Sequence, residues 1–245
     1  MQTARIRSVL TRICRSATVT LEDALMPRRC VFCGVVSCAD ERYVCAECYA
    51  DLPWIRDSCP TCALELPASV SAGVGCAQCQ SLPPPFTTTI APLAYAFPVD
   101  AAIKALKFRR KFFFVPGFAE ILLAAIGELP SDVDALLPVP LHPWRQLRRG
   151  FNQASELAKP IAAATGLPLI HNVRRTVSTP YQSGLDAKAR RQNLRSAFQI
   201  DRRIDARHVL IVDDVITTGE TCRHLAKALL YGGANKVSVL AIARA

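Results

Sequence analysis

The chain has 245 residues, enough for one domain of average size together with a small module. Its hydrophobic fraction of 51% predicts a folded protein, and since no apolar run reaches about 18 residues, we expect no membrane span. The 30 lysines and arginines exceed the 20 acidic residues, and the net charge of +10 favours a polyanionic ligand, either a phosphorylated small molecule or a nucleic acid.

The first segment, residues 1–28, is expected to form a short amphipathic helix. Its first twenty residues contain arginines but no acidic residue, and apolar residues recur at helical spacing from Ile6 to Ile13. An organelle transit peptide is the alternative interpretation. No long apolar core follows the arginines, so the segment is not a secretory signal, and we expect a cytoplasmic protein.

Residues 29–82 are defined by four C-x-x-C pairs, separated by eleven, ten and thirteen residues. Two such pairs complete a tetrahedral site with four thiolate ligands, and the spacing therefore predicts two structural zinc ions. Disulfides, which need an oxidising compartment, and an iron–sulfur cluster are the alternatives. The spacing permits both consecutive and interleaved pairing. The predicted ligands are Cys30, Cys33, Cys45, Cys48, Cys59, Cys62, Cys76 and Cys79.

The third segment, residues 83–245, begins with a proline-rich linker and then alternates between strand and helix patterns. We expect strands over 90–97, 135–141, 169–174, 209–214 and 237–243, and helices over 99–108, 116–129, 156–165 and 222–231. Such alternation predicts an α/β domain with a mainly parallel sheet, whose ligands bind beyond the carboxyl ends of the strands.

The most informative stretch is 209–221, where an apolar strand ends in the adjacent carboxylates Asp213 and Asp214. A loop rich in hydroxyl groups follows and leads into a helix, whose free N–H groups and positive dipole end suit a phosphate. Gly219 lets the backbone approach the anion, while the carboxylates can accept hydrogen bonds from vicinal sugar hydroxyls. The stretch therefore predicts a ribose 5-phosphate site made of Asp213, Asp214, Val215, Thr217, Thr218, Gly219, Glu220 and Thr221.

This stretch resembles the phosphoribosyl pyrophosphate (PRPP) motif of type I phosphoribosyltransferases. The resemblance implies that the two acids hold the ribose hydroxyls and that the loop holds the 5′-phosphate. Purine-salvage members usually carry an acid where this chain has Thr217, so the loop is more similar to the orotate type. We expect Glu220 to point toward solvent at the start of the helix, where a negative charge is favourable.

Two further segments extend the resemblance. One contains Pro138–Leu141 and the string Arg148-Arg149-Gly-Phe-Asn-Gln153, and the other contains Gln182 and Arg190. In this order behind a cysteine module, they resemble the ComF family, also called GntX-like, over most of the chain. The resemblance implies a type I phosphoribosyltransferase fold with an N-terminal double zinc ribbon. It also implies pyrophosphate or nucleic-acid contacts at Val139, Arg148, Arg149, Gln182 and Arg190.

The resemblance leaves two functions open. The first is a role in DNA uptake during natural transformation, with PRPP or a related ligand, single-stranded DNA and a DNA-import helicase as partners. The alternative is a Mg²⁺-dependent phosphoribosyltransferase that acts on an unidentified small-molecule acceptor. Basic stretches at 104–111, 145–149 and 188–195 are interspersed with aromatic residues, which is typical of single-stranded nucleic-acid grooves but also of cores. The sequence predicts neither the acceptor nor the oligomeric state.

Overall fold

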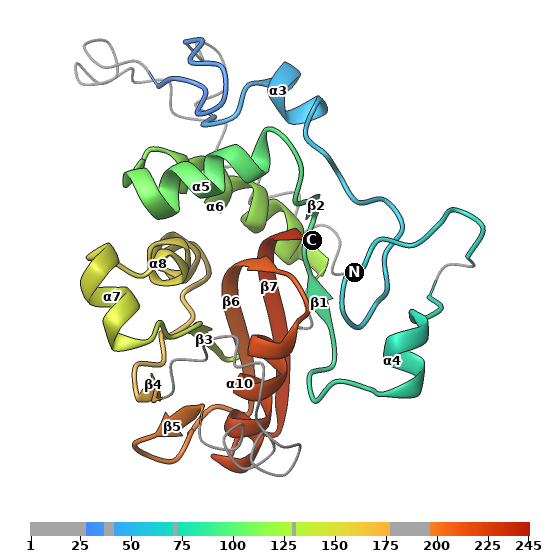
Figure 1. Cartoon of the computed structure of the whole chain (residues 1–245), viewed down its shortest axis with the longest axis vertical. Helices are drawn as coiled ribbons and strands as arrows, with labels where there is room; N and C mark the ends of the chain where they lie inside the picture. The colour runs from blue at the N-terminus through green and yellow to red at the C-terminus, as the bar shows by residue number, and fades with distance from the viewer. Residues whose placement is uncertain (1–27, 37–41, 71–72, 129–130, 177–196) are drawn as a thin grey trace, which may run out of the picture.

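The structure is a computed structural model that describes residues 28–36, 42–70, 73–128, 131–176 and 197–245 (Figure 1). The helix predicted within residues 1–28 and the basic stretch at 188–195 fall outside the described residues. Within the described part, no helix is long and apolar enough to cross a membrane.

A parallel sheet forms the centre of the molecule (Figure 1). Its strand order is β1 (Thr89–Ile90), β7 (Lys236–Arg244), β6 (His208–Ile216) and β3 (Ala135–Pro138), and β2 (Leu93–Ala94) also pairs with β7. All of these pairings are parallel. A separate antiparallel pair is formed by β4 (Val173–Arg175) and β5 (Phe198–Ile200).

Helices cover both faces of the sheet, and the alternation of side chains along β6 sorts the core into two halves. Val209 and Ile211 pack on one side with α10 (Glu220–Tyr231). Leu210 and Val212 pack on the other side with α5 (Val99–Arg109), α6 (Phe114–Ala125) and α8 (Gln153–Thr165). A strand buried on both faces is typical of a parallel sheet, and the predicted α/β class is confirmed.

Several element bounds differ from the prediction. The strand expected over 90–97 is divided into β1 and β2, because Pro92 lies between them and its carbonyl accepts a hydrogen bond from Ile55 instead. A 3₁₀ turn, η1 (Ile126–Glu128), ends the helix predicted to reach residue 129. Four short elements were not predicted: β5, α3 (Ala46–Ala50), α4 (Ala77–Ser81) and α7 (Pro143–Arg149).

The first half of the cysteine-rich segment packs against α6. An added Cβ at Gly117 would lie 2.6 Å from Val31 Cγ2 and 3.3 Å from Val44 Cγ2. The backbone N–H of Tyr43 also donates to Glu120 Oε2 at 2.8 Å. A glycine is therefore required at this point of α6 for the close approach of the two segments.

We expect Gly117→Ala to destabilise the protein by about 1–3 kcal/mol, because the added methyl group overpacks the contact with the stiff side chain of Val31. Urea denaturation measures the effect. Gly127→Ala is the matched control, since no heavy atom lies within 4 Å of its added Cβ. Equal stability of the two variants would contradict this account of the contact.

Candidate functional site

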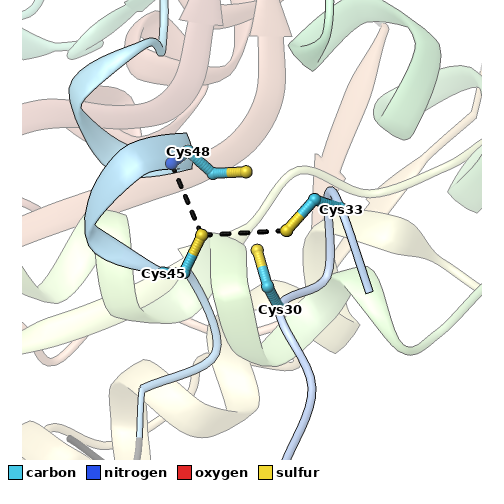
Figure 2. A group of neighbouring side chains, drawn as sticks. All are labelled: Cys30, Cys33, Cys45 and Cys48. Carbon is cyan, nitrogen blue, oxygen red and sulfur yellow. Dashed lines mark hydrogen bonds between the residues drawn. The ribbon is translucent and has the colours of Figure 1, made fainter. Parts of the chain in front are cut away.

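The eight predicted cysteine ligands form two groups of four, and within each group the Sγ atoms lie within 4.8 Å of one another. Figure 2 shows the side chains of Cys30, Cys33, Cys45 and Cys48 converging on one point. The other four cysteines, from Cys59 to Cys79, form the second group. The pairing that the sequence left open is thus consecutive. Because each group supplies four thiol ligands, both fit structural zinc sites without an open coordination position.

One cysteine in each group has a lowered pKa, whereas burial and hydrogen bonds with the other thiols raise the pKa of Cys48 and Cys79. Burial opposes ionisation of Cys30, but the N–H groups of Cys33, Cys45 and Phe32 outweigh it and lower its pKa to about 6. In the second group the same balance of burial and backbone N–H groups lowers the pKa of Cys59 to about 6. Each group therefore contains one ligand that is ionised near neutral pH before a metal arrives.

The acid pair lies near the carboxyl end of β6, with one carboxylate on each face of the sheet. Continuing the alternation of the strand, Asp213 follows the face covered by α10 and Asp214 the face covered by α5. Asp214 Oδ2 is 2.7 Å from Lys107 Nζ at the end of α5. The Asp213 carboxylate accepts a hydrogen bond from the N–H of Asp214 at 2.8 Å. Both acids are buried, although β6 continues to Ile216 rather than ending at the acids.

Three cations from other elements lie near the acid pair. Lys107 pairs with Asp214, while Arg149 lies within electrostatic range of Asp214 and Arg175 within that of Asp213. Both arginines are half-buried, and burial lowers their pKa. The guanidinium of Arg149 also lies 5.5 Å from the Phe108 ring centroid. The site therefore combines two buried acids with three cations.

The structure separates the two arginines that the sequence placed together. Arg149 is half-buried, donates to Gln153 Oε1 and lies within electrostatic range of Asp214, whereas Arg148 is exposed on α7. Lys107 and Arg175 were not among the predicted site residues. Lys107 lies in a basic run that the sequence shows, but nothing in the sequence places Arg175 near β6, because β4 approaches it only in the fold. Gln182 and Arg190 fall outside the described residues, and their roles stay predictions.

The loop after β6 leads from the acid pair into the N-terminus of α10. Gly219 is the N-cap of α10 with φ 75°, a conformation that favours glycine. Thr217 and Thr218 are exposed, and Thr218 Oγ1 accepts weakly from the N–H of Glu220 at 3.4 Å. The side chain of Glu220 is 59% exposed, with its carboxylate 3.3 Å from His224 Nε2. The N-terminus of α10 thus follows the end of β6 after a short loop.

The predicted pyrophosphate contact after β3 begins in buried backbone. The N–H of Val139 donates to the carbonyl of Val212 at 2.9 Å, and its own carbonyl accepts from Asn152 Nδ2 at 2.9 Å. These bonds fix the path of the chain where it leaves β3 for α7. A ligand contact through Val139 stays a prediction. Beside it lies a cavity of about 660 Å³ whose lining includes Pro140, Gln146, His171, Arg174 and Arg175.

Burial raises the pKa of Asp213 to about 8, with the neighbouring Asp214 charge adding to the effect. The folded chain therefore holds one more proton than the unfolded chain between pH 3.8, the ordinary value, and about 8. Over this window stability falls as the pH rises, and above it the contribution of Asp213 becomes constant. An ionised Asp213 therefore lowers the free energy of unfolding.

We expect Asp213→Asn to remove this pH dependence and to be more stable than the original chain at pH 8 by about 1.4 kcal/mol or more, the equivalent of one pKa unit. Urea denaturation at pH 5.5 and pH 8 tests the result. Asp205→Asn, at an exposed position, is the control. Parallel pH profiles for Asp213→Asn and the unchanged chain would contradict the raised pKa.

These features define a class of protein: an α/β domain with a mainly parallel sheet, an acid pair and a helix N-terminus beside it, and two zinc-ribbon-type cysteine groups ahead of it. The family model described as "Double zinc ribbon domain" matches residues 21–80. DNA utilization protein YhgH of Escherichia coli K12 is 32% identical over 225 residues, which cover 89% of this chain and 98% of that protein. Competence protein F of Haemophilus influenzae is 34% identical over 179 residues, 69% of this chain and 78% of that protein. The chain belongs to the family of these proteins, the ComF family.

Two solved structures are similar over 58% of this chain. One is described as the allosteric regulatory enzyme of purine biosynthesis, with a TM-score of 0.39 and 21% identity. The other is glutamine PRPP amidotransferase from B. subtilis complexed with ADP and GMP, with a TM-score of 0.40 and 19% identity. This chain spans 30% of the length of each.

Proposed function

We propose that the protein binds PRPP, or a related ribose 5-phosphate ligand, at Asp213–Thr221, and that it uses this site in the handling of single-stranded DNA. The observation that carries the first part is the acid pair directly ahead of a helix N-terminus that is capped by glycine. The carboxylates accept from the ribose hydroxyls, while the N–H groups of the loop and first helical turn donate to the 5′-phosphate.

The surrounding cations supply what a pyrophosphate needs. Lys107 and Arg149 lie on the Asp214 side of the site, and Arg175 lies on the Asp213 side. Mg²⁺ bound together with PRPP would offset part of the negative charge of the pyrophosphate. Without ligand, Lys107 pairs with Asp214. An incoming pyrophosphate competes for the lysine, which frees the carboxylate for a ribose hydroxyl.

The DNA part of the proposal rests on a surface formed by the end of α5, the turn that follows it and α7, which we call the basic–aromatic surface. Phe108 is 68% exposed and Trp144 is 74% exposed, beside the basic runs at 104–111 and 145–149. The turn after α5 contacts the segment after α7, since the ring centroids of Phe112 and Phe151 are 4.7 Å apart. Exposed rings among cations can stack on bases while the cations follow the phosphates.

The names of the relatives support a connection with DNA, because one refers to DNA utilization and the other to competence. Phe114, which follows the first of these basic runs, is not available for stacking on bases, because it packs with Phe32 and Phe118 against the core. A DNA-import helicase as partner remains a proposal drawn from the resemblance.

We expect binding of single-stranded DNA to be tolerant of sequence and strongly dependent on salt. Each phosphate contact costs roughly 0.7 log units of affinity for each tenfold rise in salt, because condensed counterions are released on binding. Changing Arg148 and Arg149 together to Ala should weaken binding to all sequences alike and reduce the salt slope by about 0.7, the contribution of one contact from the exposed Arg148, because Arg149 is assigned to the pyrophosphate. Fluorescence anisotropy at three salt concentrations measures both quantities.

Two single variants serve as controls: Arg207→Ala, and Arg148→Ala, which separates the contribution of Arg148 from that of Arg149. Arg207 is an exposed arginine next to the amino end of β6, at the opposite end of the strand from the acid pair. The Arg207→Ala variant should leave the salt slope of DNA binding unchanged. A double variant that binds DNA normally but loses affinity for PRPP would assign the arginines to the pyrophosphate and remove the basic–aromatic surface from the proposal.

A second candidate function is favoured by the cavity of about 660 Å³ beside the site. Its volume suits a small-molecule acceptor, and its lining combines Pro140 and Ile170 with the polar groups of Gln146, His171 and Arg175. On this alternative the protein is a Mg²⁺-dependent phosphoribosyltransferase. Release of pyrophosphate from PRPP, assayed with pooled nucleobases and amines, tests it. If PRPP binds but pyrophosphate is not released under any condition, only the binding function remains.

A further inference from the structure

The guanidinium of Arg244, the last residue of β7, joins the second cysteine group to the loop after β6. Arg244 is 8% exposed and forms no ion pair with an Asp or Glu side chain in the described part of the chain. It contacts main-chain oxygens instead. Nε donates to the carbonyl of Cys62 at 3.1 Å, and Nη1 lies against the main-chain oxygens of Ile216, at 3.1 Å, Thr217 and the neighbouring Ala245. One buried cation thus holds carbonyls from two distant segments.

Cys62 has two roles in this arrangement. Its Sγ belongs to the second cysteine group, 3.6 Å from the Sγ of Cys76, while its carbonyl accepts from Arg244. The chain turns sharply at this point, because Ala63 has φ 54° and its N–H donates to the carbonyl of Cys59 at 2.9 Å. The direction of the Cys62 carbonyl therefore depends on the turn that holds the thiols together.

The other end of the loop is tied to the same cysteine group. Arg223, in the first turn of α10, donates to the carbonyl of Leu82 at 3.3 and 3.4 Å. Leu82 is the C-cap of α4, the short helix that carries Cys79. In addition, Thr88 Oγ1 donates to the carbonyl of Pro60, between the first two ligands of this group, at 2.9 Å. The segment 217–219 is consequently held on both sides by residues that contact the second group.

The first cysteine group has a different neighbour, which makes it a natural control. It contacts α6 through Gly117 and Glu120, and neither of these contacts involves the loop after β6. A change in the first group should therefore alter its docking on α6, whereas a change in the second group should alter the loop.

We propose that Arg244 is a positioning residue through which metal binding at the second cysteine group sets the conformation of the phosphate loop. A metal bound by the four thiols would fix the Cys62 turn, whose carbonyl accepts from the Arg244 guanidinium, and the same guanidinium contacts the carbonyls of Ile216 and Thr217. The N–H groups that follow are thereby aimed at the anion. The part of this inference that concerns the ligand rests on the proposed function, whereas the coupling between the second cysteine group and the loop after β6 does not. Because coupling between two sites is reciprocal, a bound ligand must also strengthen metal binding at the second group.

The test uses the full-length chain and three variants: Cys62→Ser, which removes a ligand of the second group; Cys33→Ser, which removes a ligand of the first; and Arg244→Lys. Lysine keeps the charge but lacks the planar fork that spans several carbonyls. Hydrogen exchange of residues 216–223 reports the loop without any ligand. We expect exchange there to rise about tenfold in Cys62→Ser and Arg244→Lys but not in Cys33→Ser.

A second measurement follows release of zinc to a chelator in the presence and absence of ribose 5-phosphate. In the unchanged chain the ligand should slow release of one ion of the two by about tenfold, and in Arg244→Lys both ions should bind but the protection should disappear. If Cys62→Ser unfolds, Arg244→Lys still decides the question, because it alters no metal ligand.

Unchanged loop exchange in both Cys62→Ser and Arg244→Lys would overturn the inference, whether or not the ligand binds. Faster loop exchange in these variants, with no binding of ribose 5-phosphate or PRPP to the unchanged chain, would uphold the coupling and overturn the proposed function instead.

Discussion

Replacing Asp213 and Asp214 together with Asn is expected to weaken PRPP binding by at least about a hundredfold while the protein remains folded. The titration is run above about pH 8, where the Asp213 carboxyl is ionised. A hydrogen bond to a charged group then contributes about 1.5–3 kcal/mol, and the proposal assigns one ribose hydroxyl to each carboxylate. Asn has the same shape but no charge, and both positions are buried, so the core around β6 is conserved. Calorimetric titration with PRPP and Mg²⁺ measures the loss.

The charge change must be separated from the loss of the site. Asp51→Asn combined with Asp205→Asn changes the net charge by the same amount at two exposed positions and should bind PRPP like the unchanged chain. Unchanged affinity in the Asp213/Asp214 variant would remove the assignment of these acids to the ribose. A loss in both double variants would show that net charge, rather than the acid pair, governs binding.

The second large effect concerns the metal. We expect two zinc ions for each chain, since the eight cysteines form two groups of four. Cys30→Ser should lose one ion and Cys76→Ser the other. Each loss should also destabilise the segment around it strongly, because metal binding supplies folding free energy in such small modules. Metal analysis by mass spectrometry together with thermal denaturation measures both effects.

Cys222→Ala is the matched control for the metal variants. This cysteine lies on the buried face of α10 and belongs to neither group, so the variant should keep two ions. Iron in the purified protein, or four disulfides and no metal, would contradict the assignment. Loss of both ions in Cys30→Ser would contradict the consecutive pairing.

The sequence predicted those features that depend on local pattern. The helices at α5 and α8 and the strand β6 follow from periodicity, and the metal ligands follow from the spacing of the C-x-x-C pairs. α7 was missed because it has only seven residues and begins at Pro143, so its pattern is too short to detect. Strand order was not predictable either, since the last strand, β7, lies inside the sheet between β1 and β6.

The site was predicted in part for the same reason. Asp213, Asp214 and Gly219 are close in sequence, so one motif contains them all. Lys107 and Arg175 reach the acid pair from α5 and β4, and Arg244 reaches the loop from the far end of the chain. Contacts of this kind depend on how the elements pack, which no local pattern encodes. Consecutive pairing of the cysteines likewise required the folded geometry.

The measurement that tests the central claim most directly is calorimetric titration of the unchanged protein with PRPP and Mg²⁺, repeated after addition of short single-stranded DNA. The account predicts saturable binding of one PRPP for each chain, competition by ribose 5-phosphate, and a separate DNA-binding step that weakens with salt. Absence of PRPP binding, or binding that ribose 5-phosphate does not compete with, would contradict the assignment of Asp213–Thr221 as a ribose-phosphate site.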